Sequence, residues 1–139
     1  MKILVAVDGS QESLHAARKA LELARLCNAS VTLVHVEPPV QVYGDGGLGV
    51  SSEAIEVQRV AGEGLLADTM KVLEPSLPVP SRLSLQGPPA ESIAEVAVRD
   101  HYDIVVVGNS GRSSVSKFVL GSVADRLVRI CQTPLLIVR

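Results

Sequence analysis

Aromatic residues are scarce in this chain: it has no tryptophan, two tyrosines and one phenylalanine among 139 residues. Hydrophobic residues still make up 47% of the sequence, so the core must be built from Val, Leu, Ile and Ala. A chain of this length buries roughly two thirds of the surface that it exposes when unfolded, so folding requires no disulfide or metal. The length suits one domain, and we expect residues 1–139 to form it.

An excess of charge and long apolar runs are also missing. The net charge is −2, and the clustered basic excess that favours a nucleic-acid groove is not seen, so we expect no nucleic-acid partner. No stretch reaches the roughly 18 apolar residues of a membrane-spanning helix. The first apolar run stops at Asp8, which is too short for a signal sequence. We therefore expect a cytoplasmic protein with no membrane association.

Potential metal ligands and reactive thiols are few. The histidines, His15, His35 and His101, are dispersed and lack the spacing of a metal site. Two cysteines, Cys27 and Cys131, make no metal site by themselves. We favour two buried, reduced thiols over a disulfide. We expect His35, which lies in an apolar strand, to be a core residue with satisfied polar atoms.

Apolar runs typical of buried strands alternate with segments of helical periodicity. We expect strands at residues 2–7, 31–36, 79–85, 103–107 and 135–138, and helices at 11–27, 52–73, 89–100 and 123–130. Ser10 is the expected N-cap of the first helix, and Asn28 its expected stop. Pro80 indicates that its strand lies at an edge of the sheet. This alternation predicts an α/β fold with a parallel sheet and helices on both faces.

The Pro- and Gly-rich residues 37–50 are expected to form a long loop. Within them, Gly44-x-Gly46-x-x-Gly49 matches the dinucleotide-binding fingerprint by letters. That motif should follow a strand directly and open a helix, whereas here two prolines and further loop residues intervene. We interpret the segment as a flexible loop, and a lid over a crevice is one hypothesis for it.

The most informative segment is Gly108-Asn109-Ser110-Gly111, followed after nine residues by Gly121-Ser122. Glycines just past a strand let the backbone turn tightly and approach a ligand closely. The free N–H groups at a helix start form an anion site. The segment therefore predicts a phosphate cradle. The alternative is two structural turns with Ser122 as an ordinary N-cap.

This glycine spacing resembles the nucleotide-binding signature of the universal stress protein family, in its ATP-binding branch. The resemblance extends over nearly the whole chain, from the opening residues 3–10, through Val34-His35-Val36 and Gly87-Pro88, to residues 133–139. It implies a Rossmann-like, open five-stranded parallel sheet in the order 3-2-1-4-5, with four helices on its two faces. In that order the first and fourth strands are neighbours, so Asp8 and Gly108 would face one crevice at the switch point of the sheet.

The resemblance also implies roles for individual residues. Asp8 would contact the ribose, although a cap for the first helix, shared with Ser10, is an alternative. The backbone of Val36 would meet the adenine edge, or the residue would simply belong to the core. The residues expected at the phosphates are Gly108, Asn109, Gly111, Arg112, Gly121 and Ser122. Many relatives have His or Arg where this chain has Ser110, which removes a larger donor and leaves the backbone cradle.

The function expected from the resemblance is that of an ATP-binding, stress-response regulator. Relatives dimerise through the last strand, so we expect a homodimer through residues 135–138. Mg²⁺ or Mn²⁺ is expected to accompany the triphosphate, although no carboxylate cage is visible. No general base is apparent beside the phosphates, so we assign no catalytic residue. A slow ATPase or autophosphorylating enzyme, and a dimeric interaction module without nucleotide, are the alternatives.

Overall fold

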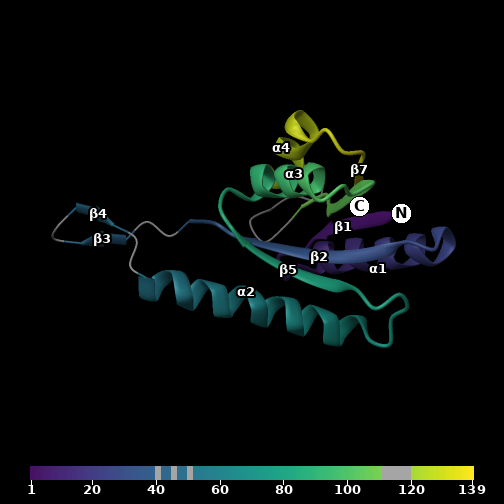
Figure 1. Cartoon of the computed structure of the whole chain (residues 1–139), viewed down its shortest axis with the longest axis horizontal. Helices are drawn as coiled ribbons and strands as arrows, with labels where there is room; N and C mark the ends of the chain where they lie inside the picture. The colour runs from purple at the N-terminus through teal and green to yellow at the C-terminus, as the bar shows by residue number, and fades with distance from the viewer. Residues whose placement is uncertain (40–41, 45–46, 50–51, 111–119) are drawn as a thin grey trace.

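The computed structural model describes residues 1–39, 42–44, 47–49, 52–110 and 120–139. Five strands form a parallel sheet in the order β5-β2-β1-β6-β7, which confirms the expected order 3-2-1-4-5 (Figure 1). The strands of this sheet are β1 (Lys2–Ala6), β2 (Ser30–Glu37), β5 (Ser81–Gln86), β6 (Ile104–Gly108) and β7 (Leu135–Val138). The helices are α1 (Gln11–Cys27), α2 (Ser52–Leu73), α3 (Pro89–Arg99) and α4 (Ser122–Ile130).

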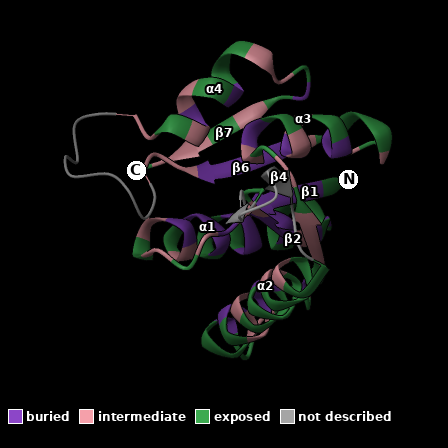
Figure 2. Cartoon of the chain, turned by 90° about the vertical axis from the view of Figure 1, so that its left-hand side faces the viewer, coloured by how far each residue is buried: buried purple, intermediate pink, exposed green. Residues whose placement is uncertain are grey.

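The sheet separates two aliphatic cores. Alternate side chains of a strand point to opposite faces, so Ile3 and Val5 pack with α1 and α2, whereas Leu4 packs with α3 and α4. All three side chains are fully buried. The central strand β1 and its neighbours β2 and β6 carry most of the buried strand residues, with helices above and below them (Figure 2). The core is thus aliphatic, as the scarcity of aromatic residues requires.

The ends of α1 follow the expected signals. Ser10 has an extended backbone, and its side-chain oxygen accepts a hydrogen bond from the Ser13 N–H at 3.1 Å, as an N-cap does. Asn28 ends the helix in the left-handed conformation, with φ of 51°. The cap fixes the chain between β1 and α1, which is the segment that contains Asp8.

Helix α2 has the expected bounds, but its first turns extend past the sheet (Figure 1). Ile55, which lies in these first turns, is therefore 39% exposed, while Leu66 and Leu73 are buried. Gly62 is also buried, and the helix continues unbroken through it. Packing against β2 and β5 stabilises the second half of α2 despite its glycines.

The expected loop at residues 37–50 contains a hairpin instead. Strands β3 (Val42–Gly44) and β4 (Gly47–Gly49) pair antiparallel, with Gly44 opposite Gly47. Asp45-Gly46, which lies between them outside the described residues, is a strong hairpin signal that the loop interpretation ignored. Two glycines of the fingerprint-like pattern thus lie in short strands, and not in a turn between a strand and a helix.

The thiols are unpaired, as expected, but neither has the full burial that was expected. Cys27 is exposed at the end of α1, and Cys131 is partly buried after α4. The Cys131 thiol donates to the Thr133 carbonyl at 3.3 Å, and burial raises its pKa. Within the described ranges, no helix combines the length and apolar character needed to cross a membrane.

Candidate functional site

A crevice of about 250 Å³ opens at the carboxyl edge of the sheet. Its walls come from the ends of β1, β2 and β6 and from the first turns of α3 and α4. Strand β1 leads to α1 on one face, and the path beyond its neighbour β6 leads to α4 on the other, so the crevice lies at the topological switch point. Figure 2 looks onto this edge of the sheet.

Asp8 lines the crevice just beyond β1. Its Oδ1 accepts hydrogen bonds from the Ser10 hydroxyl at 2.6 Å and from the Ser10 N–H at 3.0 Å. The buried Ser13 hydroxyl accepts the Asp8 N–H at 3.3 Å and donates to the Ser10 carbonyl at 3.0 Å. Asp8 thus supports the Ser10 cap, and the same network holds its carboxylate at the crevice.

Val36 presents its backbone to the crevice. Parallel strands use the peptide groups of alternate residues for each neighbour, and the Val7 N–H donates to the Val34 carbonyl at 2.9 Å on the β1 side. The Gly87 N–H donates to the Glu37 carbonyl at 2.9 Å on the β5 side. The N–H and C=O of Val36 therefore point the same way as those of Val34, past the end of β1. The Val36 side chain is buried, so the residue belongs to the core, while its backbone faces the crevice.

The two glycine turns meet beyond β6. The Gly121 N–H donates to the Asn109 carbonyl at 2.7 Å, and the Asn109 N–H donates to the Val138 carbonyl at 2.8 Å. Gly108 packs tightly, since a Cβ there would lie 3.0 Å from the backbone of Glu12 in α1. Segments that are far apart in the sequence thus close one end of the crevice.

Helix α4 begins at this end of the crevice. Gly121 occupies its N-cap and provides no side-chain cap, so the alternative with Ser122 as N-cap is wrong. Ser122, Val123 and Ala124 line the crevice, and the first intrahelical bond runs from the Asp125 N–H to the Gly121 carbonyl at 2.8 Å. The N–H groups of the three lining residues precede that bond and have no acceptor within the helix.

The remaining predicted residues lie elsewhere. Asn109 lines a neighbouring hollow beside the start of α1, and not the crevice itself. Ser110 lies at both. Gly111 and Arg112 fall outside the described residues.

Three polar residues that line the crevice were missed as site residues. His35 is 5% exposed and lines the crevice together with Glu37, its hydrogen-bonded neighbour. Residues two apart on a strand share a face, a signal that could have paired them from the sequence. Ser13, three residues after the Ser10 cap, had no comparable signal.

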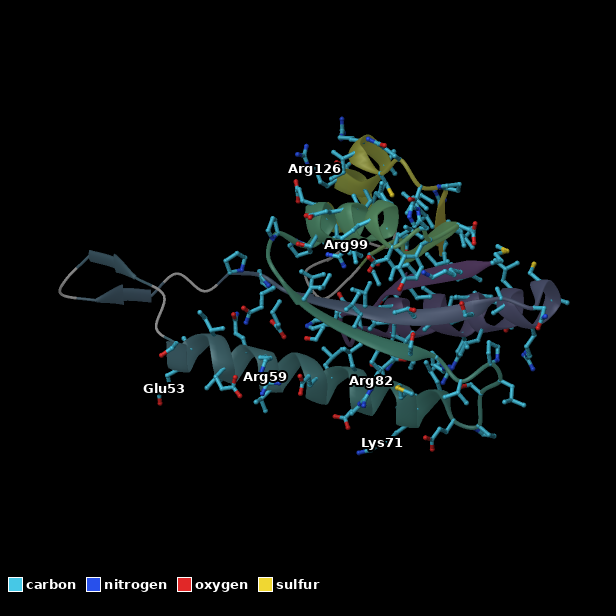
Figure 3. The ribbon with its side chains drawn as sticks, viewed as in Figure 1. Glu53, Arg59, Lys71, Arg82, Arg99 and Arg126 are labelled. Carbon is cyan, nitrogen blue, oxygen red and sulfur yellow. The ribbon has the colours of Figure 1, made fainter. Side chains whose placement is uncertain are left out.

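Charged side chains are mostly kept away from the crevice. Figure 3 labels arginines from α2, β5, α3 and α4, and none of these four lines it. The Arg126 guanidinium pairs with Glu91 between α4 and α3, which lowers the pKa of that carboxyl. The residues with assigned positions include no cluster of three His, Cys, Asp or Glu side chains suited to a metal ion. The crevice therefore combines apolar walls with backbone donors, Asp8 and the His35–Glu37 pair.

Comparison with known proteins places this geometry in a family. The sequence model of the universal stress protein family matches residues 1–139. A Thermus aquaticus protein named "Universal stress protein in QAH/OAS sulfhydrylase 3'region" is 33% identical over 137 residues, which cover 99% of this chain and 97% of that protein.

Solved structures show the same fold. Universal stress protein UspA from Lactobacillus plantarum has a TM-score of 0.84 at 19% identity, over 100% of this chain and 97% of that one. A universal stress protein in complex with cAMP has a TM-score of 0.70 at 24% identity, with coverage of 100% and 97%. One from Archaeoglobus fulgidus in complex with dAMP has 0.69 at 22%, with coverage of 100% and 98%. The chain belongs to the universal stress protein family.

Proposed function

We propose that residues 1–139 form a single nucleotide-binding domain that holds ATP in the switch-point crevice and acts as a stress-response regulator. The observation that carries the proposal is the pairing of two features in one crevice. Outward peptide groups of Val36 lie among apolar walls, and the N-terminus of α4 has no side-chain cap. By contrast, the N-terminus of α1 is capped by Ser10. Related proteins of known structure were solved with cAMP and dAMP, which supports an adenine nucleotide.

The backbone of Val36 suits adenine. Adenine presents an amino donor beside a ring-nitrogen acceptor, which match a C=O and an N–H of one residue. Guanine presents the O6 acceptor in place of that donor, so the same backbone would face an acceptor with its carbonyl. Val34 and Ile93 add apolar surface to the crevice. Asp8, beside this end, would accept hydrogen bonds from the ribose.

The phosphates would lie against α4. Its unpaired N–H groups and the positive end of its dipole favour anions. Gly108, Gly121 and Ser122 would form the backbone of this end, and Asn109, Gly111 and Arg112 remain predicted contributors. Near the expected phosphates, the described part of the crevice offers the Asp8 carboxylate as a metal ligand, and one of its oxygens is already bonded to Ser10. Mg²⁺ or Mn²⁺ would therefore be held mainly by phosphate oxygens, where it neutralises their charge.

The nucleotide released from freshly purified, denatured protein tests this function. Stoichiometric ATP, identified by chromatography, supports a regulator that binds tightly and turns over slowly. Release of ADP would favour the slow ATPase. No released nucleotide, together with no thermal shift on adding ATP and Mg²⁺, would contradict the proposal and favour an interaction module.

Asp8→Asn tests the site with little structural change, because an asparagine oxygen can still accept from Ser10. At ATP about one hundred times above Kd, the wild-type fold should gain roughly 2.7 kcal/mol, or about 9 °C for a chain of this size. We expect Asp8→Asn to lose much of that gain at the same ATP concentration. Asp68→Asn, at an exposed position of α2, is the matched control. Equal ATP-induced shifts in both variants would refute the ribose assignment.

We also propose that two copies associate through β7, the last strand of the sheet. Leu136 is 37% exposed there, and the outer peptide groups of an edge strand are free to pair with another chain. Sedimentation at micromolar concentration should show a dimer, and a monomer alone would refute the proposal. Our sequence-based expectation of a cytoplasmic location is tested by cell fractionation.

A further inference from the structure

His35 connects the ends of the two strands that flank the crevice. Its Nδ1 lies 2.7 Å from the carbonyl oxygen of Val7, and its Nε2 lies 2.9 Å from Oε1 of Glu37. Val7 precedes Asp8 in the chain, and Glu37 follows Val36. The imidazole therefore ties the backbone beside the proposed ribose contact to the residue beside the proposed adenine contact.

Hydrogen-bond chemistry determines how this imidazole is held. A carbonyl oxygen only accepts, so Nδ1 must carry a proton and donate it to Val7. The contact between Nε2 and Glu37 also needs a proton, on either the ring or the carboxyl group, because two lone pairs at this distance would repel. The side chains of His35 and Glu37 are only 6% and 17% exposed, so water has little access to replace either bond.

Helix α2 supports the pair from behind. A Cβ at Gly62 would lie 3.3 Å from Cδ2 of His35 and 3.4 Å from Cγ of Glu37. The glycine thus lets the α2 backbone rest directly on both side chains. With one bond to each strand and a helix behind it, the ring has little freedom to shift. None of these contacts is needed merely to fill the aliphatic core, which a Leu or Val at this position would do.

We propose that His35 is a positioning residue that fixes the span between Asp8 and the backbone of Val36, and so aligns the ribose and adenine contacts of one nucleotide. This inference rests on the proposed nucleotide site. His35 acts through Val7 and Glu37, and its loss removes one of the links between the two contacts while each contact remains present; the backbone bond from the Val7 N–H to the Val34 carbonyl is kept. A nucleotide that must satisfy both contacts at once then binds more weakly.

Calorimetric titration of ATP into the full chain tests the inference with three single variants and one double variant. His35→Leu removes both hydrogen bonds and puts an apolar side chain of similar size in place of the imidazole. We expect this variant to bind ATP about tenfold more weakly, since the coupling energy between interacting residues is commonly of this order. His35→Asn places an amide N–H near the former Nδ1 position and should recover most of the loss. In the Asp8→Asn background, His35→Leu should weaken ATP binding by less than about threefold, because no ribose contact remains to be aligned.

The outcomes separate the two proposals. If the wild-type protein binds no adenine nucleotide, the proposed function itself fails. If it binds ATP and His35→Leu binds equally well, or loses the same factor in the Asp8→Asn background, the positioning role is refuted and His35 is only a core residue.

If His35→Leu does not fold, a measurement on the wild-type protein tests the hydrogen bond between His35 and Val7 directly. Nitrogen-15 NMR of the imidazole should show a proton on Nδ1 that is protected from exchange. An Nδ1 without a proton would overturn the proposed link to Val7. Gly64→Ala, on the exposed side of α2 with no atom within 4 Å of the new Cβ, should leave ATP affinity unchanged as a control.

Discussion

Gly62 and Gly64 offer a test of how closely α2 must approach the sheet. Both glycines lie inside α2, two residues apart, and differ in what surrounds them. A Cβ at Gly62 would lie 3.0 Å from the Ser84 hydroxyl oxygen and 3.3 Å from the His35 ring, whereas a Cβ at Gly64 would have no neighbour within 4 Å. The same substitution, glycine to alanine, therefore separates helix propensity from packing.

Each substitution gains about 0.8–1.0 kcal/mol from the better helix propensity of alanine. At Gly64 we expect that gain alone. At Gly62 the extra methyl group also meets overpacking, which costs roughly 1–3 kcal/mol. The Ser84 hydroxyl can rotate away, but the His35 ring is held at both nitrogens. Gly62→Ala should thus lose about 0–2 kcal/mol in net stability, so the two variants should differ by about 1–3 kcal/mol.

Thermal unfolding without nucleotide, followed by circular dichroism at one protein concentration, measures this difference. The unfolding entropy of a 139-residue chain is roughly 0.3 kcal/mol per kelvin, so the midpoints should differ by about 3–10 °C. Ser84→Ala, which removes the nearest atom, should restore part of the stability of Gly62→Ala. Equal midpoints for Gly62→Ala and Gly64→Ala would refute the close packing of α2 on the sheet.

Three further predictions follow from particular contacts. Gly108→Ala should lower stability by about 1–3 kcal/mol and weaken ATP binding, because the new Cβ lies 3.0 Å from the backbone of α1, which cannot rotate away. Unfolding and ATP-titration curves of the variant that match those of the wild type would contradict this. Near neutral pH, iodoacetamide should label the exposed Cys27 before Cys131, whose pKa is raised by burial. Mass spectrometry of the peptides measures the order of labelling, and labelling of Cys131 first would contradict the prediction. Arg126→Ala breaks an exposed pair with Glu91 and should leave the midpoint of urea unfolding close to that of the wild type, so a clear loss would show that this pair holds α3 to α4.

Much of the fold could be predicted because local signals agree with the tertiary structure. The apolar runs of β1 and β6, the Ser10 cap and the Asn28 stop all appear where the sequence indicates them. The strand order came from the resemblance to a family, since periodicity does not specify which strands are neighbours. The hairpin at 42–49 was missed because glycine and proline content outweighed a two-residue turn signal.

The candidate site was predictable where it depends on backbone and topology. The strand order implied by the resemblance placed Asp8 and Gly108 at one edge, the resemblance itself added Val36, and all three residues line one crevice. Strand periodicity could have paired His35 with Glu37, but the contact of His35 with a backbone carbonyl 28 residues away has no signal in the sequence. Likewise, the buried position of Gly62 depends on where α2 crosses β5, which no local pattern encodes.

The crevice is assembled from residues 6 to 124, which has a consequence for synthesis on the ribosome. The residues around Asp8 and Val36 leave the exit tunnel long before α4 does, at the rate of about 5–20 residues per second at which chains grow. For several seconds the nascent protein therefore displays one half of the crevice without the other. A nucleotide that needs both halves can bind only after α4 has emerged, so ligand binding would follow the assembly of the sheet and would not act as a template for its first strands.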